Sequence, residues 1–237
     1  MFPADDFMER LNERINTIPS SWLDFDELPS YTEVMSTLGQ IEGRNNPFGN
    51  LFFSWCTQHG VYEMFTKEYV FSMAEYLTGR CVHLDHPLIL EVGAGNGRLT
   101  HHLRKHLDVE MIATDSFDDF WPIDRSEEHV ENLDHKQAME KYAVDGRDVI
   151  IVVSWMPYQD DWTPDFRENP NVVEYVFIGE GWGGCCGDES VFEEAVLEKD
   201  GFYYEDVDLH RQICRTDWGF GEWGCHYHSS TFSFRRY

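Results

Sequence analysis

Three glycines spaced two residues apart form the segment of this sequence best suited to bind a ligand. Gly93, Gly95 and Gly97 follow an apolar run at 88–92 and precede a helical pattern at 99–107. Glycine adopts positive φ and lets a ligand approach the backbone closely. The amides and the positive dipole end of the following helix attract a carboxylate or a phosphate. We therefore expect a binding site at this turn between a strand and a helix.

Two acidic residues flank the glycine-rich turn. Glu91 stands two residues before the first glycine, and Asp115 directly follows a second apolar run at 109–114. Nicotinamide-binding enzymes space their glycines as G-x-G-x-x-G, whereas the spacing here is G-x-G-x-G. The turn therefore differs from the nicotinamide type.

The pattern Glu91-x-Gly93-x-Gly95-x-Gly97 resembles the first motif of the class I (Rossmann-like) S-adenosylmethionine-dependent methyltransferases. The resemblance covers roughly residues 87 to 237 and implies S-adenosylmethionine as the cofactor. It implies that Asp115 binds the two ribose hydroxyls, which need one bidentate acceptor. It also implies that an acid after the third strand accepts the adenine amino group, and that the fourth strand opens onto the catalytic loop. The cofactor-binding residues that it indicates are Glu91, Gly93, Gly95, Gly97, Asp115, Asp134, His135 and Ser154.

Aromatic and acidic side chains follow the fourth and fifth expected strands, at the end where ligands bind in open α/β sheets. Trp155 and Tyr158 follow the fourth strand, and Glu180 and Trp182 follow the fifth. Aromatic faces attract a sulfonium or ammonium cation, so Trp155 and Trp182 are candidate substrate-binding residues. Tyr158 and Glu180 are candidate catalytic residues, since Glu180 could act as a base or pair with a cationic substrate. The alternatives are ordinary packing of the tryptophans and a solvated loop acid at position 180.

The charge of the chain restricts its partners. The chain has 18 basic and 44 acidic residues and a formal net charge of −26, which repels phosphate backbones and anionic lipids. The loop Met156-Pro157-Tyr158 lacks the Asp/Asn-Pro-Pro-Tyr/Phe pattern common in related enzymes that act on exocyclic amines of bases. Both features argue against nucleic acid as the substrate. An acidic field steers a cationic small molecule or a basic peptide inward; solubility alone is the alternative explanation.

Apolar runs that alternate with helical segments predict an α/β sheet with helices on both faces. Residues 149–153 are all Val or Ile, which is typical of a central parallel strand. Residues 202–209 and 226–234 alternate in hydropathy and predict a closing antiparallel pair. On the second of these strands, His226 and His228 would share a face, as a general base or as part of an exposed surface. Together with the resemblance, this predicts a Rossmann-like, mostly parallel, seven-stranded sheet, with further strands at 88–92, 109–114, 129–133 and 173–178.

The segment before the sheet is predicted to be helical. We expect an N-terminal helical cap at 1–85 and the Rossmann-like core at 86–237, with one cap helix at 62–77. Arg44 and Asn46 lie in a turn-rich loop of the cap and are candidate substrate-binding residues; a surface turn is the alternative. A cap that closes over the reaction excludes water from methyl transfer.

The sequence has six cysteines, and it begins without a basic leader followed by an apolar run. We therefore expect reduced thiols in a cytoplasmic protein. Because no Cys-x-x-Cys spacing occurs, we expect no metal site. No run approaches the ~18 apolar residues that a membrane span needs. We therefore expect an S-adenosylmethionine-dependent methyltransferase that acts on a small molecule, with a cationic or amine-bearing molecule as a candidate. The alternatives are a methyltransferase of a basic protein or peptide side chain, and a catalytically inactive cofactor-binding module. The sequence does not indicate the acceptor atom or the oligomeric state.

Overall fold

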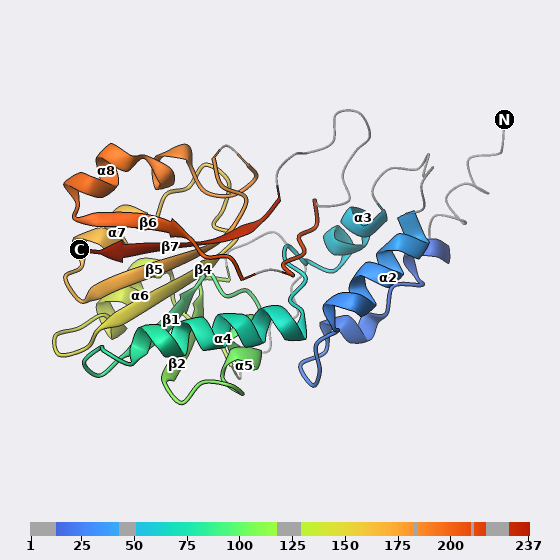
Figure 1. The fold of residues 1–237 in the computed structure, drawn as a ribbon, viewed down its shortest axis with the longest axis horizontal. Coiled ribbons are helices and arrows are strands. Elements are labelled where there is room, and N and C mark those ends of the chain that lie inside the picture. Colours follow the sequence, from blue (N-terminus) through green and yellow to red (C-terminus); the bar gives the residue numbers. More distant parts are fainter. Residues whose placement is uncertain (1–12, 43–50, 118–128, 183, 210, 217–227) are drawn as a thin grey trace.

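The computed structural model describes residues 13–42, 51–117, 129–182, 184–209, 211–216 and 228–237. Within these residues, seven strands form one sheet in the order β3-β2-β1-β4-β5-β7-β6 (Figure 1). Strands β1 to β5 run parallel, and β7 runs antiparallel to both of its neighbours. The predicted mostly parallel seven-stranded sheet and its antiparallel pair are confirmed. The strands are β1 Leu88–Val92, β2 Glu110–Asp115, β3 Glu131–Asn132, β4 Val149–Ser154, β5 Val172–Gly179, β6 Phe202–Asp206 and β7 Ser230–Arg236.

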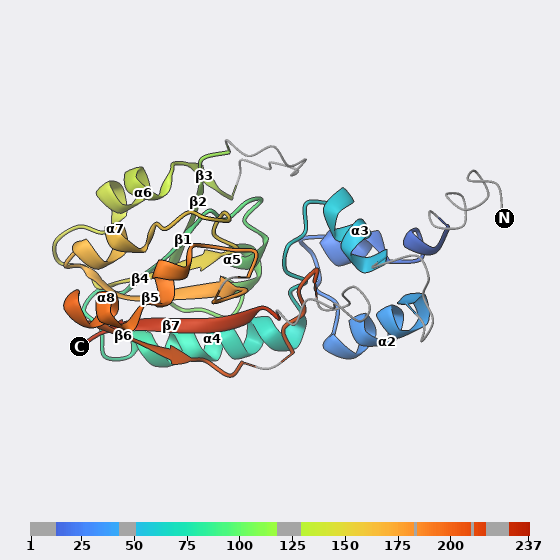
Figure 2. The same cartoon turned by 90° about the horizontal axis from the view of Figure 1, so that it is seen from above.

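Helices cover both faces of the sheet, because its central strands carry consecutive apolar side chains that point alternately to the two sides. Leu90 and Ile151 pack with α6, α7 and α8, whereas Ile89 and Ile150 pack with α4 and α5. Figure 2 places α6 and α4 on opposite sides of the sheet. The described helices are η1 Ser20–Leu23, α2 Tyr31–Glu42, α3 Leu51–Gln58, α4 Lys67–Cys81, α5 Arg98–Leu103, α6 His135–Tyr142, α7 Thr163–Glu168, η2 Glu189–Phe192 and α8 Glu194–Lys199.

The elements η1, α2 and α3 form a cluster of their own, here called the N-terminal lobe. Trp22, Leu38 and Trp55 are buried in it, and Ile213 joins them from far along the chain. Figures 1 and 2 show α2 and α3 beyond the end of the sheet toward which the parallel strands run. The lobe therefore lies at the carboxyl edge of these strands, where open α/β sheets bind their ligands.

Helix α4 packs on the sheet, although it falls within the predicted cap at 1–85. Its apolar face shares a cluster with Ile150. The fully buried carboxylate of Glu174, on β5, accepts hydrogen bonds from the Tyr76 hydroxyl, from Arg80 Nε at 2.5 Å and from Ser233 Oγ at 2.7 Å. This network ties α4 to the sheet, and the domain boundary at residue 85 stays a prediction.

The helix predicted at 62–77 begins later than expected. It starts at Lys67, because the Thr66 side chain caps it by accepting a hydrogen bond from Tyr69 N at 3.2 Å. The residues before the cap pair with a distant segment instead, and Met64 N donates to Ile213 O at 2.8 Å. The apolar spacing of 62–66 therefore reflects burial beside another chain segment rather than a helical face.

The late strand begins at Ser230, four residues after the predicted start. His228 consequently precedes β7 and is exposed, so its predicted place on a strand face is wrong. His226 lies outside the described residues.

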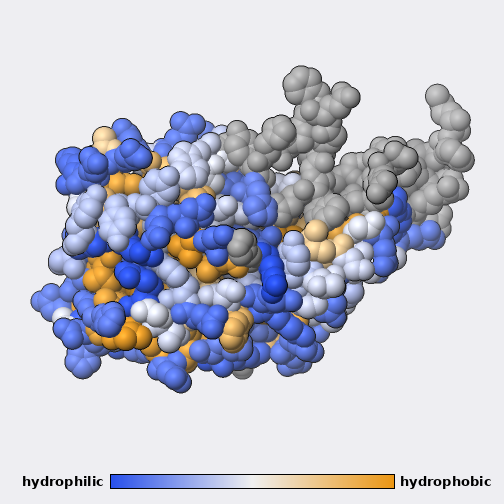
Figure 3. Space-filling view, viewed as in Figure 1, coloured by the Kyte–Doolittle hydropathy of each residue, from blue (hydrophilic) through white to orange (hydrophobic). Residues whose placement is uncertain are grey.

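Hydrophilic residues dominate the molecular face drawn in Figure 3. In the described ranges, no helix combines the length and the apolar character needed to cross a bilayer.

Candidate functional site

The glycine-rich turn joins β1 to α5 and forms a tight backbone cradle. Its glycines have positive φ, +67° at Gly93, +58° at Gly95 and +74° at Gly97, which residues with side chains rarely adopt. A Cβ atom at Gly97 would lie 2.4 Å from Val130 Cγ2. Position 97 therefore has no room for a side chain, because Val130 packs against the turn there.

Asp115, at the carboxyl end of β2, contacts this turn directly. Its Oδ2 accepts a hydrogen bond from Gly95 N at 2.7 Å, and its Oδ1 accepts one from Phe117 N at 2.7 Å. The structure thus brings the residue expected to bind ribose against the turn expected to face the cofactor.

Glu91 lies behind the turn rather than in front of it. Its side chain is buried, and its Oε2 accepts hydrogen bonds from Thr100 N at 3.1 Å and from the Thr100 hydroxyl. Burial raises the pKa of Glu91 to about 7, against the lowering effect of the Thr100 bonds. The carboxyl group therefore holds the first turn of α5 in place below the glycines.

An aromatic pair flanks the other side of the turn. Two ring carbons of Trp162 lie 3.1 Å from the position that a Cβ atom would take at Gly93. The indole stacks on the imidazole of His135, with ring centroids 4.8 Å apart and planes 8° apart. His135 Nε2 lies 2.9 Å from Asp165 Oδ2. Sequence reasoning identified His135 but missed Trp162. The sequence shows only that Trp162 stands directly before Thr163 and Pro164, where α7 begins.

Asp134 performs a structural task in this conformation. It caps α6 by accepting a hydrogen bond from Gln137 N at 2.8 Å, and the Gln137 side chain accepts one in return from Asp134 N at 3.1 Å. Its predicted contact with adenine stays a prediction.

The loop after β4 starts beside the glycine turn. Val153 pairs with Val92 across β4 and β1, so Ser154 and Gly93 follow at the same edge of the sheet. Trp155 has φ of +57°, unusual for a residue with a large side chain. Its side chain is buried, and its Nε1 donates to Glu63 Oε2 at 2.9 Å.

An arginine from a distant segment completes this region. The Arg215 guanidinium carbon lies 4.4 Å from the ring centroid of Tyr62, 5.1 Å from that of Trp155 and 5.5 Å from that of Phe53. These distances are typical of cation–π contacts. Sequence reasoning missed Arg215, because the segment 211–216 carries no periodic pattern that would place it beside Trp155.

Glu180 is buried, so the alternative of a solvated loop acid is wrong. Its Oε2 accepts a hydrogen bond from Cys185 N at 2.7 Å, and its Oε1 accepts one from the Thr216 hydroxyl. The carboxylate thereby ties the loop after β5 to the segment that carries Arg215. Its predicted role as a base stays a prediction.

The predicted catalytic residue Tyr158 and the remaining predicted substrate-binding residues lie at the surface or outside the described ranges. Tyr158 is 64% exposed, and Trp182 is 52% exposed and packs its ring on Phe192 at 4.6 Å. Arg44 and Asn46 belong to the residues that the structure does not describe. Of the predicted cofactor residues, Asp115 bonds the turn directly, Glu91 bonds the helix behind it, and His135 stacks on Trp162, which packs against Gly93.

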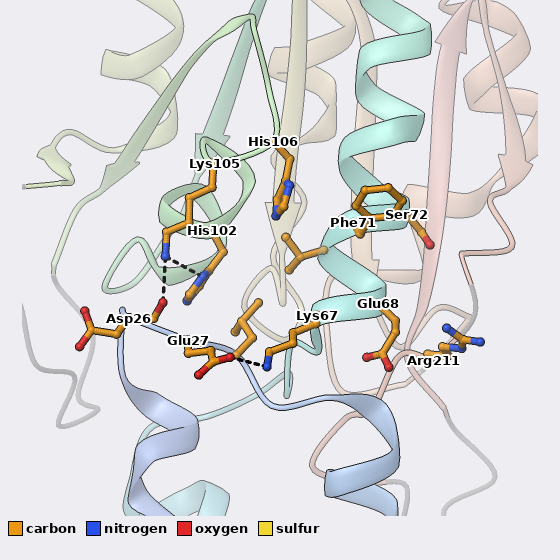
Figure 4. Close-up of a pocket in the computed structure, with 12 residues that line it drawn as sticks. Asp26, Glu27, Lys67, Glu68, Phe71, Ser72, His102, Lys105, His106 and Arg211 are labelled. Carbon is orange, nitrogen blue, oxygen red and sulfur yellow. Dashed lines mark hydrogen bonds and ion pairs between the residues drawn. The ribbon is translucent and has the colours of Figure 1, made fainter.

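A cavity of about 550 Å³ lies elsewhere, between the segment 26–28, the start of α4, and α5 (Figure 4). Lys67 and Glu27 form an ion pair at its rim with a 2.6 Å separation, and the cavity is also lined by His102 on α5 and by Lys105, just after that helix. None of the site residues predicted from the sequence lines this cavity. Among the described residues, no group of three or more His, Cys, Asp or Glu side chains is arranged to hold a metal ion.

The strand order decides the fold family. Five parallel strands in the order 3-2-1-4-5, extended by an antiparallel β7 inserted before β6, are typical of class I methyltransferases. This is the class I methyltransferase fold. It confirms the fold that the glycine motif predicted.

Comparisons with known proteins add distant structural likenesses. No protein-family model and no curated protein sequence matches the chain. Among solved structures, the plantazolicin methyltransferase BpumL is 10% identical, with 97% of this chain and 99% of that chain covered at a TM-score of 0.39. The 23S rRNA methyltransferase ErmE is 15% identical over 73% of this chain and 69% of its own, at a TM-score of 0.37. The tRNA (m1A58) methyltransferase TrmI from Aquifex aeolicus is 9% identical. The match covers 79% of this chain and 75% of that chain, at a TM-score of 0.39. Likenesses this distant carry no argument about substrate or activity.

Proposed function

We propose that the chain is an S-adenosylmethionine-dependent methyltransferase that acts on a small molecule. The observation that carries this proposal is the 2.7 Å hydrogen bond between Gly95 N and Asp115 Oδ2. It joins a glycine turn without room for side chains to a carboxylate at the neighbouring strand end. A nucleoside lying across that edge would have its hydroxyls at the acid and its charged tail at the start of α5.

The residues around the turn fit this cofactor. Asp115 would accept the ribose hydroxyls, and the backbone of Gly93 and Gly95 would approach the amino-acid portion. The stacked pair of His135 and Trp162 offers an aromatic surface for the adenine ring. Asp134 is the proposed acceptor for the adenine amino group.

The bound cofactor supplies an activated methyl group. The protein would orient the acceptor and exclude water, and good alignment alone lowers such barriers by about 7–11 kcal/mol. The N-terminal lobe beyond the strand ends supports a small, enclosed substrate over an open peptide groove. A base is needed only for an acceptor that is protonated at working pH, and Glu180 and Tyr158 are the proposed candidates.

Calorimetric titration with S-adenosylhomocysteine tests the cofactor site. We expect binding by the wild-type protein, and an Asp115→Ala variant should bind about tenfold or more weakly, because the ribose hydroxyls lose a charged acceptor. Asp206→Ala is the matched control, since Asp206 is exposed at the end of β6, away from the turn in the sheet order.

Equal affinity of wild type and Asp115→Ala would refute the placement of the ribose. Absence of any binding by the wild-type protein would refute the proposed function. Release of S-adenosylhomocysteine from S-adenosylmethionine, in the presence of a metabolite mixture, separates an active enzyme from an inactive cofactor-binding module.

A further inference from the structure

The cavity of about 550 Å³ beside the start of α4 has the size of a small-molecule site. Leu28, Val70 and Phe71 give it an apolar wall, and the Phe71 ring is 51% exposed. The charged residues that line it are three acids and three bases, which are Asp26, Glu27, Glu68, Lys67, Lys105 and Arg211. A purely apolar ligand would desolvate these charges without compensation. A fitting ligand therefore combines an apolar part with charge.

Contacts on both sides fix the walls of this cavity. Lys105 Nζ, just after α5, donates to Phe25 O at 3.0 Å and to Asp26 O at 3.2 Å. Lys67 N, in the first residue of α4, donates to Pro29 O at 3.0 Å. These bonds tie the chain at 25–29 to both helices (Figure 4). The cavity is thus formed before any ligand arrives, which lowers the cost of binding.

Most of the charges in the cavity already have a partner in the protein. Lys67 pairs with Glu27 at 2.6 Å. The Lys105 ammonium bonds the two backbone carbonyls and lies 3.4 Å from His102 Nδ1. Burial lowers the pKa of His102 to about 3, so this imidazole adds no charge at neutral pH. The Asp26 carboxylate points away from the other side chains in Figure 4. One acid and one base of the six are left to meet a ligand.

This remaining pair is Glu68 and Arg211, which lie at the same end of the cavity in Figure 4. Arg211 has φ of +62°, which residues with side chains rarely adopt, and its carbonyl accepts from Thr66 Oγ1 at 3.3 Å. Glu68 Oε2 accepts from Tyr31 N at 2.7 Å. Among the contacts of the described residues, none engages Glu68 Oε1 or the Arg211 guanidinium, and no ion pair joins the two side chains. An acceptor and a set of charged donors are therefore presented together.

We propose that this cavity binds a free α-amino acid with an apolar side chain. Such a molecule carries its carboxylate and its ammonium on one carbon atom, so it needs a base and an acid at one end of its site. Arg211 would bind the carboxylate through two parallel hydrogen bonds, and Glu68 would accept from the ammonium. The side chain would lie along Val70 and Phe71. The inference goes beyond the proposed function, because it assigns a second ligand to a site apart from the glycine turn.

Three probes with one aromatic body test this assignment. Calorimetric titration compares phenylalanine, which has both charges, with 3-phenylpropanoate and phenethylamine, which each have one. We expect phenylalanine to bind about tenfold or more tightly than either, because each of the others loses one charged contact. Shifts in the backbone amide signals of α4 and of residues 211–213 in nitrogen-15 NMR locate the bound probe.

Substitutions separate the two charges. Arg211→Gln should weaken the binding of phenylalanine and 3-phenylpropanoate about tenfold and leave that of phenethylamine unchanged. Glu68→Gln should weaken phenylalanine and phenethylamine instead, while its amide oxygen can still accept from Tyr31 N. Thermal unfolding establishes that each variant is folded.

Arg147→Gln and Glu75→Gln are the matched controls, because they remove the same charges outside the cavity. Arg147 pairs with Glu110 before the start of β4, and Glu75 is exposed further along α4. Both control variants should bind all three probes as the wild type does.

Three results would overturn the proposal. They are binding of a singly charged probe as tight as that of phenylalanine, unchanged phenylalanine affinity in Arg211→Gln or Glu68→Gln, and no binding of any probe at millimolar concentration. The titration with S-adenosylhomocysteine is a separate measurement. If S-adenosylhomocysteine binds and phenylalanine does not, the amino-acid site fails while the proposed function stands. If phenylalanine binds and S-adenosylhomocysteine does not, the proposed function fails instead.

Discussion

Glu91 illustrates how one buried side chain makes the stability of this protein depend on pH. Its carboxyl group lies behind the glycine turn, where Oε2 accepts hydrogen bonds from Thr100 N and from the Thr100 hydroxyl. Desolvation raises its pKa from the ordinary 4.5 to about 7. The folded chain therefore holds a proton in a pH range where the unfolded chain has already released it.

The sign of the effect follows from this difference. Between pH 4.5 and about 7, the folded state binds more protons at Glu91 than the unfolded state, so stability falls as the pH rises. We expect wild type to lose about 3 kcal/mol across this range relative to Glu91→Gln, whose amide does not titrate. Urea unfolding of both proteins at several pH values measures the difference. A difference that does not change with pH would contradict the assignment, and Glu205→Gln, at an exposed position, is the control.

At the scale of residues, the sequence predicted those site residues whose roles depend on their neighbours along the chain. The glycine turn and Asp115 were identifiable because strand, turn and acid follow one another in a fixed order. Trp162 and Arg215 were not, because their roles come from segments that meet only in the folded chain. Arg215 reaches Tyr62 through a β-bridge between residues far apart in sequence, and no local pattern encodes that meeting.

At the scale of elements, α4 and β5 depend on one buried ionic network. Glu174 is fully buried and pairs with Arg80, whereas Glu205 on β6 is 54% exposed and pairs with Arg235 at 2.7 Å. The two glutamates offer the same chemistry in opposite environments.

Replacing each glutamate by alanine measures the effect of that environment. We expect Glu174→Ala to lower the free energy of unfolding by about 3–5 kcal/mol, because Arg80 loses its carboxylate partner at the helix–sheet contact. Glu205→Ala should change it by about 0–1 kcal/mol. Chemical denaturation followed by circular dichroism provides both values. Similar losses in the two variants would mean that the network does not hold α4 on the sheet.

The order of strands and helices was largely predictable, because runs of Val, Ile and Leu alternate with amphipathic segments from residue 87 onward. The start of α4 was not, since the apolar residues at 62–66 continue the helical spacing while their backbone pairs with 213–215. Burial by a distant segment and burial on a helix face produce similar spacing, and only the cap at Thr66 distinguishes them.

At the scale of the whole molecule, Arg98 links the N-terminal lobe to the proposed cofactor site. It is the first residue of α5, directly after Gly97, and its guanidinium donates to Trp22 O in the lobe. The side chain is buried, and burial lowers its pKa to about 10. The lobe is thus attached to the backbone that follows the glycine turn.

Hydrogen–deuterium exchange tests this attachment. Arg98→Met keeps the apolar stem but removes the donor, and we expect faster exchange in η1 and α2 with unchanged exchange in β4 and β5. Arg104→Met is the control, because Arg104 also follows the glycine turn but bonds to the sheet. Its Nε and Nη2 donate to Met111 O, on β2, at 2.9 and 2.7 Å. Unaltered exchange in the lobe after Arg98→Met would show that other contacts hold it.

The position of β7 has a consequence for how the chain is made. It lies between β5 and β6 but is translated after both. While a ribosome is still synthesising residue 230, β5 presents an unpaired edge and β6 has no neighbour in the sheet. Such edges recruit other chains, so a nascent protein halted at this point should depend on chaperones until translation delivers the strand that joins them.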